Sequence, residues 1–150
     1  MFPFYYRQFK DSINIRRTES IDYRKGLFIY LIPMGISIKD FAEKILGLEH
    51  EDLKKREIFI KFIIAAGKVV FDPQLFVNFE KTYGEGSLYH KDIADANMIE
   101  RGQVYGGAYA AVSWDRVRIT GKSMDFGGIE GYEEVVRSYF ENYFENSVTL

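Results

Sequence analysis

One run of apolar residues constrains the fold of this chain more than any other segment. Residues 57–64 are apolar except for an initial glutamate and Lys61, and a short apolar run of this kind is typical of a buried β-strand. Residues 65–68 then predict a tight turn into a second strand over 68–72, which ends at Pro73. The chain is therefore expected to form a β-sheet that contains this strand.

Lys61 interrupts the strand and needs a physical explanation. Because side chains alternate along a strand, Lys61 shares a face with Phe59 and Ile63. Its ammonium must therefore reach water at the rim of the sheet, meet a carboxylate, or bind an anionic ligand. When the strand is taken alone, an edge or end position at which the amine simply reaches water is the simpler interpretation.

The rest of the chain predicts further strands and several helices. Strands are expected over residues 26–32, 104–114 and 116–120. Helices are expected over 37–47, over 87–100 and after Gly128, whereas residues 75–82 fit either a strand or a helix. The last helix carries an apolar stripe at helical spacing, formed by Tyr132, Val135, Val136, Tyr139, Phe140, Tyr143 and Phe144. The predicted fold class is α/β (α+β), with one mixed β-sheet flanked by helices.

The length and composition indicate one domain that follows an N-terminal arm. A chain of 150 residues that is 47% hydrophobic can bury a substantial core. Residues 1–25 mix aromatic and basic side chains without a clean period, which predicts an arm ahead of a single α/β domain over residues 26–150. Basic residues interleaved with aromatic ones can follow a single-stranded nucleic acid. The acidic residues among them favour packing onto the domain or onto a second subunit instead.

The composition also excludes several classes of function. The chain has no cysteine, so it has no disulfide, no thiolate nucleophile and no cysteine-ligated metal. Its two histidines, His50 and His90, cannot form a three-histidine metal site. The formal charge of −2 gives no overall attraction to nucleic acid or to an anionic membrane. The apolar runs are too short to span a bilayer, and residues 1–10 lack the apolar block of a signal peptide, so we expect a cytoplasmic protein with no membrane partner.

The residues that could form a site are concentrated between positions 86 and 128. Ser87 is a candidate N-cap, which would place His90 in the first turn of a helix, where free backbone N–H groups favour an anion. A lone histidine is more often a surface or half-buried residue that catalyses nothing. Gly106 and Gly107 lie inside a predicted strand, where they indicate either a bulge or the close approach of another group to the backbone.

Familiar nucleotide and hydrolase motifs are missing from the sequence. Residues 121–123 (Gly-Lys-Ser) resemble the end of a phosphate-binding loop but lack the preceding glycine at the required spacing. The chain has no nucleophile elbow, no zinc-protease motif and no dinucleotide fingerprint. No pair of carboxylates is identifiable as a glycosidase or metal pair from the sequence.

The order of these features resembles the janus/ocnus family, whose members are protein phosphohistidine phosphatase-like. The matching features, over residues 57–145, are the strand with an internal lysine at residues 60–62, the Tyr-His-Lys-Asp-Ile segment 89–93, the glycine pair 106–107, and the Gly-Lys-Ser-Met-Asp-Phe-Gly segment 121–127. The resemblance implies a small α/β domain, here with an additional N-terminal strand and helix, and no cofactor or metal ion.

The resemblance also implies roles for particular residues. His90 would be the catalytic histidine, acting as general base on the attacking water or as transient phosphate acceptor, and Lys61 would bind the substrate phosphate. The Ser123 hydroxyl and the backbone N–H groups of Ser123, Met124 and Asp125 would line the phosphate pocket. The implied pocket residues are Gly106, Gly107, Ser123, Met124 and Asp125. The substrate would be a phosphorylated protein or a small phosphoramidate.

Two positions depart from the family pattern. Ala108 stands where the family has an arginine after its glycines, and Arg116, Arg118 or Lys122 could supply the missing charge. Asp125 stands where the family has a small residue, and its carboxylate would repel a phosphate unless it faces away.

The sequence leaves a second function open. A relative that has kept the fold but not the activity could use the N-terminal arm to bind protein or nucleic acid, or could form a homodimer. The phosphatase hypothesis requires Lys61 and His90 to lie on the same rim of the sheet, because both must contact one anion. The binding-module hypothesis does not require this.

Overall fold

The structure is a computed structural model and describes residues 15–17, 31–33, 35–146 and 148–150. Its strands are β1 (Ile15–Arg17), β2 (Leu31–Pro33), β3 (Ile58–Ala65), β4 (Lys68–Phe71), β5 (Val104–Val112), β6 (Val117–Thr120) and β7 (Val148–Thr149). Its helices are α2 (Ile38–Asp40), continued by the π-helical η2 (Phe41–Leu46), then α3 (Asp52–Lys55), α4 (Pro73–Tyr83), α5 (His90–Ala96), the 3₁₀ turn η3 (Arg101–Gln103) and α6 (Glu133–Tyr143).

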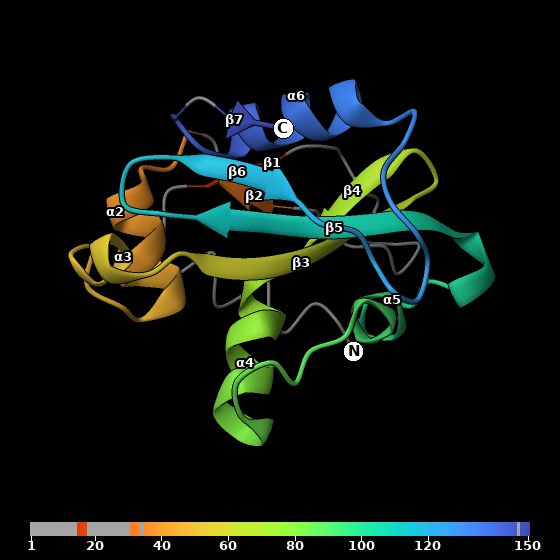
Figure 1. The fold of residues 1–150 in the computed structure, drawn as a ribbon, viewed down its shortest axis with the longest axis horizontal. Helices are drawn as coiled ribbons and strands as arrows, with labels where there is room; N and C mark the ends of the chain where they lie inside the picture. The colour runs from red at the N-terminus through yellow and green to blue at the C-terminus, as the bar shows by residue number, and fades with distance from the viewer. Residues whose placement is uncertain (1–14, 18–30, 34, 147) are drawn as a thin grey trace.

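The main sheet has five strands in the order β4-β3-β5-β6-β7. Strand β3 pairs antiparallel with both β4 and β5, β5 pairs antiparallel with β6, and β6 pairs parallel with β7. Helix α6 covers one face of this sheet, and α4 and α5 lie on the other (Figure 1). The predicted mixed sheet flanked by helices is therefore confirmed, within one domain, and β1 and β2 form a separate two-stranded sheet.

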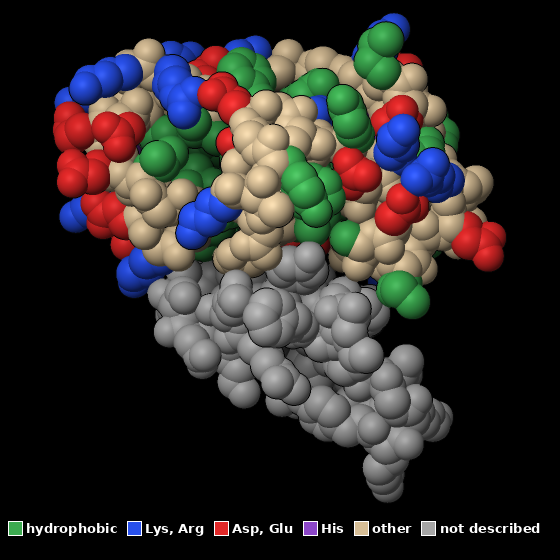
Figure 2. All heavy atoms as spheres, turned by 90° about the horizontal axis from the view of Figure 1, so that it is seen from below, with side chains coloured by type: hydrophobic (Ala, Val, Ile, Leu, Met, Phe, Trp, Pro, Cys, Tyr) green, Lys and Arg blue, Asp and Glu red, His purple; other side chains and the backbone are tan. Residues whose placement is uncertain are grey.

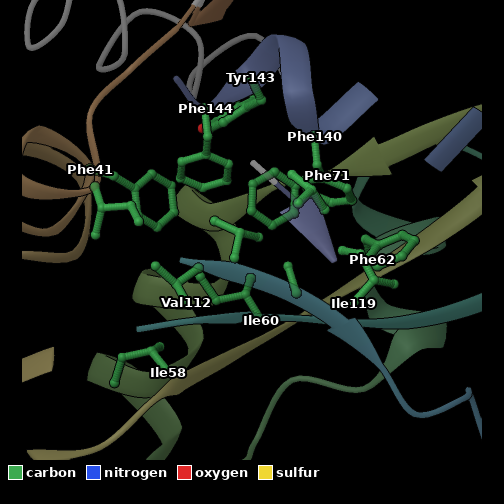
Figure 3. Packing of buried hydrophobic residues seen from close by; sticks show 14 of the residues in the cluster. Phe41, Ile58, Ile60, Phe62, Phe71, Val112, Ile119, Phe140, Tyr143 and Phe144 are labelled. Atoms are coloured by element: carbon green, nitrogen blue, oxygen red, sulfur yellow. The ribbon is translucent and has the colours of Figure 1, made fainter. Parts of the chain in front are cut away.

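The larger hydrophobic core lies between the sheet and the helices α2, η2 and α6. The alternate residues Ile58, Ile60, Phe62 and Ile64 of β3 all point into it. Aromatic rings from η2, β4 and α6 pack on one another there, with the centroids of Phe71 and Phe140 4.9 Å apart (Figure 3). A smaller cluster on the opposite face contains Ile63, Leu75, Leu88, Ile93 and Ala94. The two faces of β3 thus belong to two different cores.

The predicted helix ends are correct at the first capped helix and nearly so at α6. The Ser37 hydroxyl accepts a hydrogen bond from the Asp40 N–H at 3.0 Å, and Gly47 ends the helical segment in the left-handed region with φ +70°. Helix α6 begins at Glu133, so Tyr132 lies just before it. Within the predicted stripe, Val135 is 39% exposed, whereas Val136, Phe140, Tyr143 and Phe144 are buried.

Several predicted boundaries differ from the structure. The strand expected over 26–32 lies mostly outside the described residues, as does most of the arm expected over 1–25, and β2 runs on through Pro33. Strands β5 and β6 are shorter than expected because residues 113–116 form the turn that joins them, closed by a 3.0 Å hydrogen bond from the Ser113 N–H to the Arg116 carbonyl.

The segment that fitted either strand or helix is helix α4. Asp72 decides this, because its buried carboxylate accepts a hydrogen bond from the Leu75 N–H at 3.2 Å while Pro73 occupies the first helical turn. The same carboxylate accepts a hydrogen bond from the Asn97 side chain at 3.3 Å. Burial raises the pKa of Asp72, and the two hydrogen bonds oppose that rise.

We therefore expect Asp72→Ala to lower the free energy of unfolding by about 1 kcal/mol or somewhat more, because it removes both the N-cap of α4 and the partner of Asn97. Asp72→Asn keeps the oxygen that caps Leu75 but turns an amide N–H toward the Asn97 amide, so we expect a smaller loss than in Asp72→Ala. Urea unfolding at neutral pH measures both variants. Equal losses in the two would mean that the charge, and not the cap, is what stabilises α4.

Candidate functional site

Lys61 lies in strand β3, one residue before residues 62–65, which pair with β4. Strand β3 is flanked by β4 and β5, and Lys61 stands directly opposite Tyr109 of β5. Its partly buried ammonium donates a hydrogen bond to the Leu88 carbonyl at 2.6 Å and lies 5.5 Å and 5.7 Å from the ring centroids of Tyr89 and Tyr109. The simpler interpretation, an edge or end position at which the amine only reaches water, is therefore wrong about the amine, which donates to the Leu88 carbonyl. The ammonium lies near two tyrosine rings and contacts the backbone just before α5.

Burial lowers the pKa of Lys61, and the negative charges of Asp125, Asp92 and Glu80 oppose this change. An ammonium has three N–H donors, and Leu88 takes one of them. Lys61 thus brings a partly desolvated positive charge with further donors to this face of the sheet.

His90 is the first residue of α5 and is only 2% exposed. Its Nε2 lies 2.9 Å from the Ala108 carbonyl oxygen, and its ring meets the Tyr109 ring edge-on, with the centroids 5.3 Å apart. Because a carbonyl oxygen can only accept, Nε2 carries the hydrogen and Nδ1 carries the lone pair. No residue in the described part of the chain forms a hydrogen bond with Nδ1.

The electrostatic surroundings of His90 favour the neutral ring. Burial lowers the pKa of His90 and the charge of Lys61 lowers it further, whereas the hydrogen bond to Ala108 and the charge of Asp125 raise it. The net direction is downward from the ordinary value. A neutral imidazole with a free Nδ1 is the form that can accept a proton or attack an electrophile.

The prediction that Ser87 caps this helix is wrong. The Ser87 hydroxyl donates to the Phe79 carbonyl of α4 at 3.1 Å, and the helix begins three residues later, with Tyr89 as its N-cap. Asp92 closes the first turn by accepting a hydrogen bond from the Tyr89 N–H at 2.8 Å. The helix ends at Ala96, earlier than predicted. It is too short for its dipole to attract an anion strongly, and Lys61 supplies the positive charge instead.

The two glycines of β5 are places where other groups touch the backbone. A Cβ at Gly107 would lie 2.7 Å from His90 Cδ2 and 2.7 Å from the Phe62 carbonyl oxygen, and a Cβ at Gly106 would lie 1.8 Å from the Gly128 carbonyl oxygen. The β3–β5 register also shifts next to Gly106, between Ile64 and Ala65. The bulge and the close approach therefore occur together.

Residues 121–128 form a loop that lies against Gly107. The Gly107 N–H donates to the Gly127 carbonyl at 3.0 Å, and the Ser123 N–H donates to the Gly107 carbonyl at 3.0 Å. The buried Ser123 hydroxyl accepts hydrogen bonds from the N–H groups of Asp125 and Phe126 at 3.1 Å and 3.0 Å. The glycine strand thus places this loop beside His90.

These hydrogen bonds correct part of the predicted phosphate pocket. The N–H groups of Ser123 and Asp125 both have partners inside the protein, so they are not free donors to an anion in this conformation. Of the three predicted N–H donors, only that of Met124 has no partner among the described residues, and the Met124 side chain is 93% exposed. The Ser123 hydroxyl holds the loop in shape.

The structure also changes how the departure at Ala108 is interpreted. The Ala108 side chain is fully buried in the larger core, on the opposite face, and only its carbonyl faces His90. Tyr109 is the residue after the glycines whose side chain lies on the site face. Arg116 and Arg118 do not supply a free charge, because they pair with Asp115 and with Glu57 at 3.6 Å and 2.8 Å.

The structure thus brings Lys61, His90, Gly107 and the loop around Ser123 together, and it adds two residues that sequence reasoning missed. Tyr89 and Tyr109 are the aromatic rings around the Lys61 ammonium. The sequence indicates neither as a site residue, because the pairing of Tyr109 with Lys61 depends on strand register.

Seen from the α4 and α5 side, acidic and basic side chains intermingle over the described part of the surface (Figure 2).

Among the described residues, no group of three or more histidine, aspartate or glutamate side chains could hold a metal ion. In the same part of the chain, every helix is too short or too polar to cross a membrane. Compared with known proteins, the chain matches no family model, no curated protein and no solved structure. The janus/ocnus resemblance therefore stays a prediction, and the functional argument depends on the geometry of the site.

We expect Gly107→Ala to lower the free energy of unfolding by about 1–3 kcal/mol, because the added methyl group must displace either the His90 ring or the backbone of β3. Gly102→Ala is the matched control, since a Cβ there would meet nothing within 4 Å. It should change the stability by no more than about 1 kcal/mol. Denaturant unfolding distinguishes the two, and equal stabilities would contradict the close packing of β5 against His90.

Proposed function

We propose that this chain is a metal-independent phosphatase that hydrolyses phosphohistidine or a related phosphoramidate. The observation that carries the proposal is the state of His90. Its Nε2 is held by the Ala108 carbonyl, its Nδ1 is left without a partner among the described residues, and burial together with the charge of Lys61 lowers its pKa. Both side chains contact the same ring, that of Tyr109.

In the proposed reaction, Lys61 binds the phosphoryl oxygens and offsets their negative charge. His90 Nδ1 then acts in one of two ways. It takes a proton from a water molecule whose oxygen attacks phosphorus, or it attacks phosphorus itself and a water molecule later cleaves the resulting phosphoryl-histidine. In both routes the P–N bond breaks, its electron pair stays on the leaving nitrogen, and that nitrogen takes up a proton from solvent.

Asp125 fits a phosphoramidate better than a phosphate ester. Its carboxylate lies close enough to influence the pKa values of both Lys61 and His90. A negative charge there disfavours the phosphoryl oxygens of an ester and of a phosphoramidate alike. It favours a leaving nitrogen that carries a proton. The substrate would be a phosphorylated protein or a small phosphoramidate, and the site would act in the cytoplasm without a cofactor.

The alternative is a non-catalytic binding module that has the same fold but not the activity. It would use the N-terminal arm to bind its partner. Most of that arm lies outside the described residues, and no contact in the described part favours a nucleic-acid, protein or homodimer partner. The phosphatase proposal is therefore the one that the geometry supports.

We expect the purified protein to hydrolyse a small phosphoramidate in the presence of a chelator, and His90→Ala to reduce kcat/KM at least about 100-fold, the lower range for the loss of an acid–base group. His50→Ala is the matched control, because His50 contacts the Trp114 carbonyl away from this site. Release of inorganic phosphate measures the rates. Equal rates for His90→Ala and the parent protein would eliminate the proposal.

We also expect the His90 imidazole to titrate below the ordinary histidine pKa of 6.5, since burial and Lys61 both disfavour the protonated ring. Activity that needs the neutral ring should then persist below pH 6.5 and decline as pH falls through the lowered pKa. Lys61→Met removes the neighbouring positive charge and should raise the pKa of His90.

NMR titration of the two imidazole rings, with His50→Ala for assignment, tests this electrostatic arrangement without depending on activity. A His90 titration midpoint that falls in Lys61→Met would show that the two side chains do not face each other.

A further inference from the structure

Tyr109 occupies the centre of the site, with its ring held on three sides. His90 meets it edge-on at 5.3 Å between centroids, and the Lys61 ammonium lies 5.7 Å from its centroid. The backbone of Gly121 closes the third side, because a Cβ there would lie 2.7 Å from Tyr109 Cδ1 and 3.0 Å from Cε1. Packing on this scale restricts the ring to one orientation.

The Tyr109 hydroxyl, in contrast, has no hydrogen-bond partner in the described part of the chain. Among the described residues, the Tyr143 hydroxyl is the only buried side-chain polar atom without a partner, so the Tyr109 hydroxyl is not enclosed in the core. The side chain as a whole is half-buried. Tyr109 thus combines a fixed ring beside Lys61 and His90 with a hydroxyl that has no partner among the described residues.

We propose that the Tyr109 hydroxyl donates a hydrogen bond to the phosphoryl group of the substrate, as a second binding residue beside Lys61. This inference rests on the proposed phosphatase function. The loop N–H groups of Ser123 and Asp125 have internal partners, and Arg116 and Arg118 pair with carboxylates. Among the predicted loop donors, only the Met124 N–H lacks a partner in the described part of the chain, so the phenol of Tyr109 is a further donor for a phosphoryl group at Lys61.

A neutral donor also suits the charge of this site. Asp125 already opposes an anion near Lys61, and a phenol adds a hydrogen bond without adding a second positive charge. Tyr89 is a less suitable donor, although its ring lies equally close to Lys61. It is 55% exposed, and no ring contact joins it to His90 within the described residues.

The test compares the parent protein with Tyr109→Phe, which keeps the ring and removes only the hydroxyl. Inorganic phosphate is the probe, and its dissociation constant is measured by calorimetry and as a competitive inhibition constant against a small phosphoramidate. We expect phosphate to bind roughly 10- to 100-fold more weakly to Tyr109→Phe, the range for losing a hydrogen bond to a charged group. The KM for the phosphoramidate should rise with it.

Two controls separate this role from a structural one. Tyr83→Phe removes an exposed hydroxyl on α4, on a ring that contacts Phe79, and should leave phosphate binding unchanged. The unfolding midpoint of Tyr109→Phe and the NMR titration of His90 should both match those of the parent protein, because the ring contacts are retained. A role limited to packing of the ring would leave both the midpoint and the phosphate affinity unaltered, because phenylalanine keeps the ring.

An unchanged phosphate dissociation constant in Tyr109→Phe, with an active parent protein and an inactive His90→Ala, would overturn this inference alone and leave the phosphatase proposal standing. A parent protein that neither binds phosphate nor hydrolyses the phosphoramidate would overturn both. Weaker phosphate binding in Tyr109→Phe together with normal binding in Tyr83→Phe would establish the hydroxyl as a phosphoryl ligand.

Discussion

The close approach of two segments to the backbone of β5 at its glycine pair is the constraint on which the rest of the site depends. His90 packs against Gly107 from one side, and the loop over residues 121–128 packs against Gly106 and forms hydrogen bonds with Gly107. Only residues without a Cβ allow both contacts. The same two residues thereby position the imidazole, shape the loop and leave the Ala108 carbonyl free to orient His90. The glycines set the geometry of the site without contributing any chemistry of their own.

Electrostatic balance is the second organising feature. Lys61 sits partly buried between two tyrosine rings, and its hydrogen bond to the Leu88 carbonyl offsets part of the cost of removing an ammonium from water. Its charge helps to keep His90 neutral, whereas Asp125 acts on both in the opposite sense. A neutral imidazole beside an ammonium can accept a proton or a phosphoryl group while the ammonium binds the anion. The proposed chemistry follows from this division of roles.

Local signals were reliable where a short segment contained all the interactions that decide its structure. The Ser37 cap with Asp40, the turn before β4 and the buried face of α6 depend on residues within a few positions of one another. The prediction failed at Ser87 for the complementary reason. Its hydroxyl has a partner eight residues earlier, on α4, and Asp92 closes the first turn of α5 instead. Competition between a local cap and a contact with another element is not visible in sequence spacing.

The sequence by itself determined the strand with Lys61, the glycine pair, the capped helix at Ser37 and the absence of cysteine chemistry, because these follow from residue type and short-range periodicity. The tertiary structure alone decided which of these residues meet. The β3–β5 register places Tyr109 opposite Lys61 and sends the Ala108 side chain into the other core, since a shift of one residue would exchange the two faces. Register depends on pairing between residues far apart in the chain. For that reason the aromatic surroundings of Lys61 and the orientation of His90 became apparent only in the folded protein.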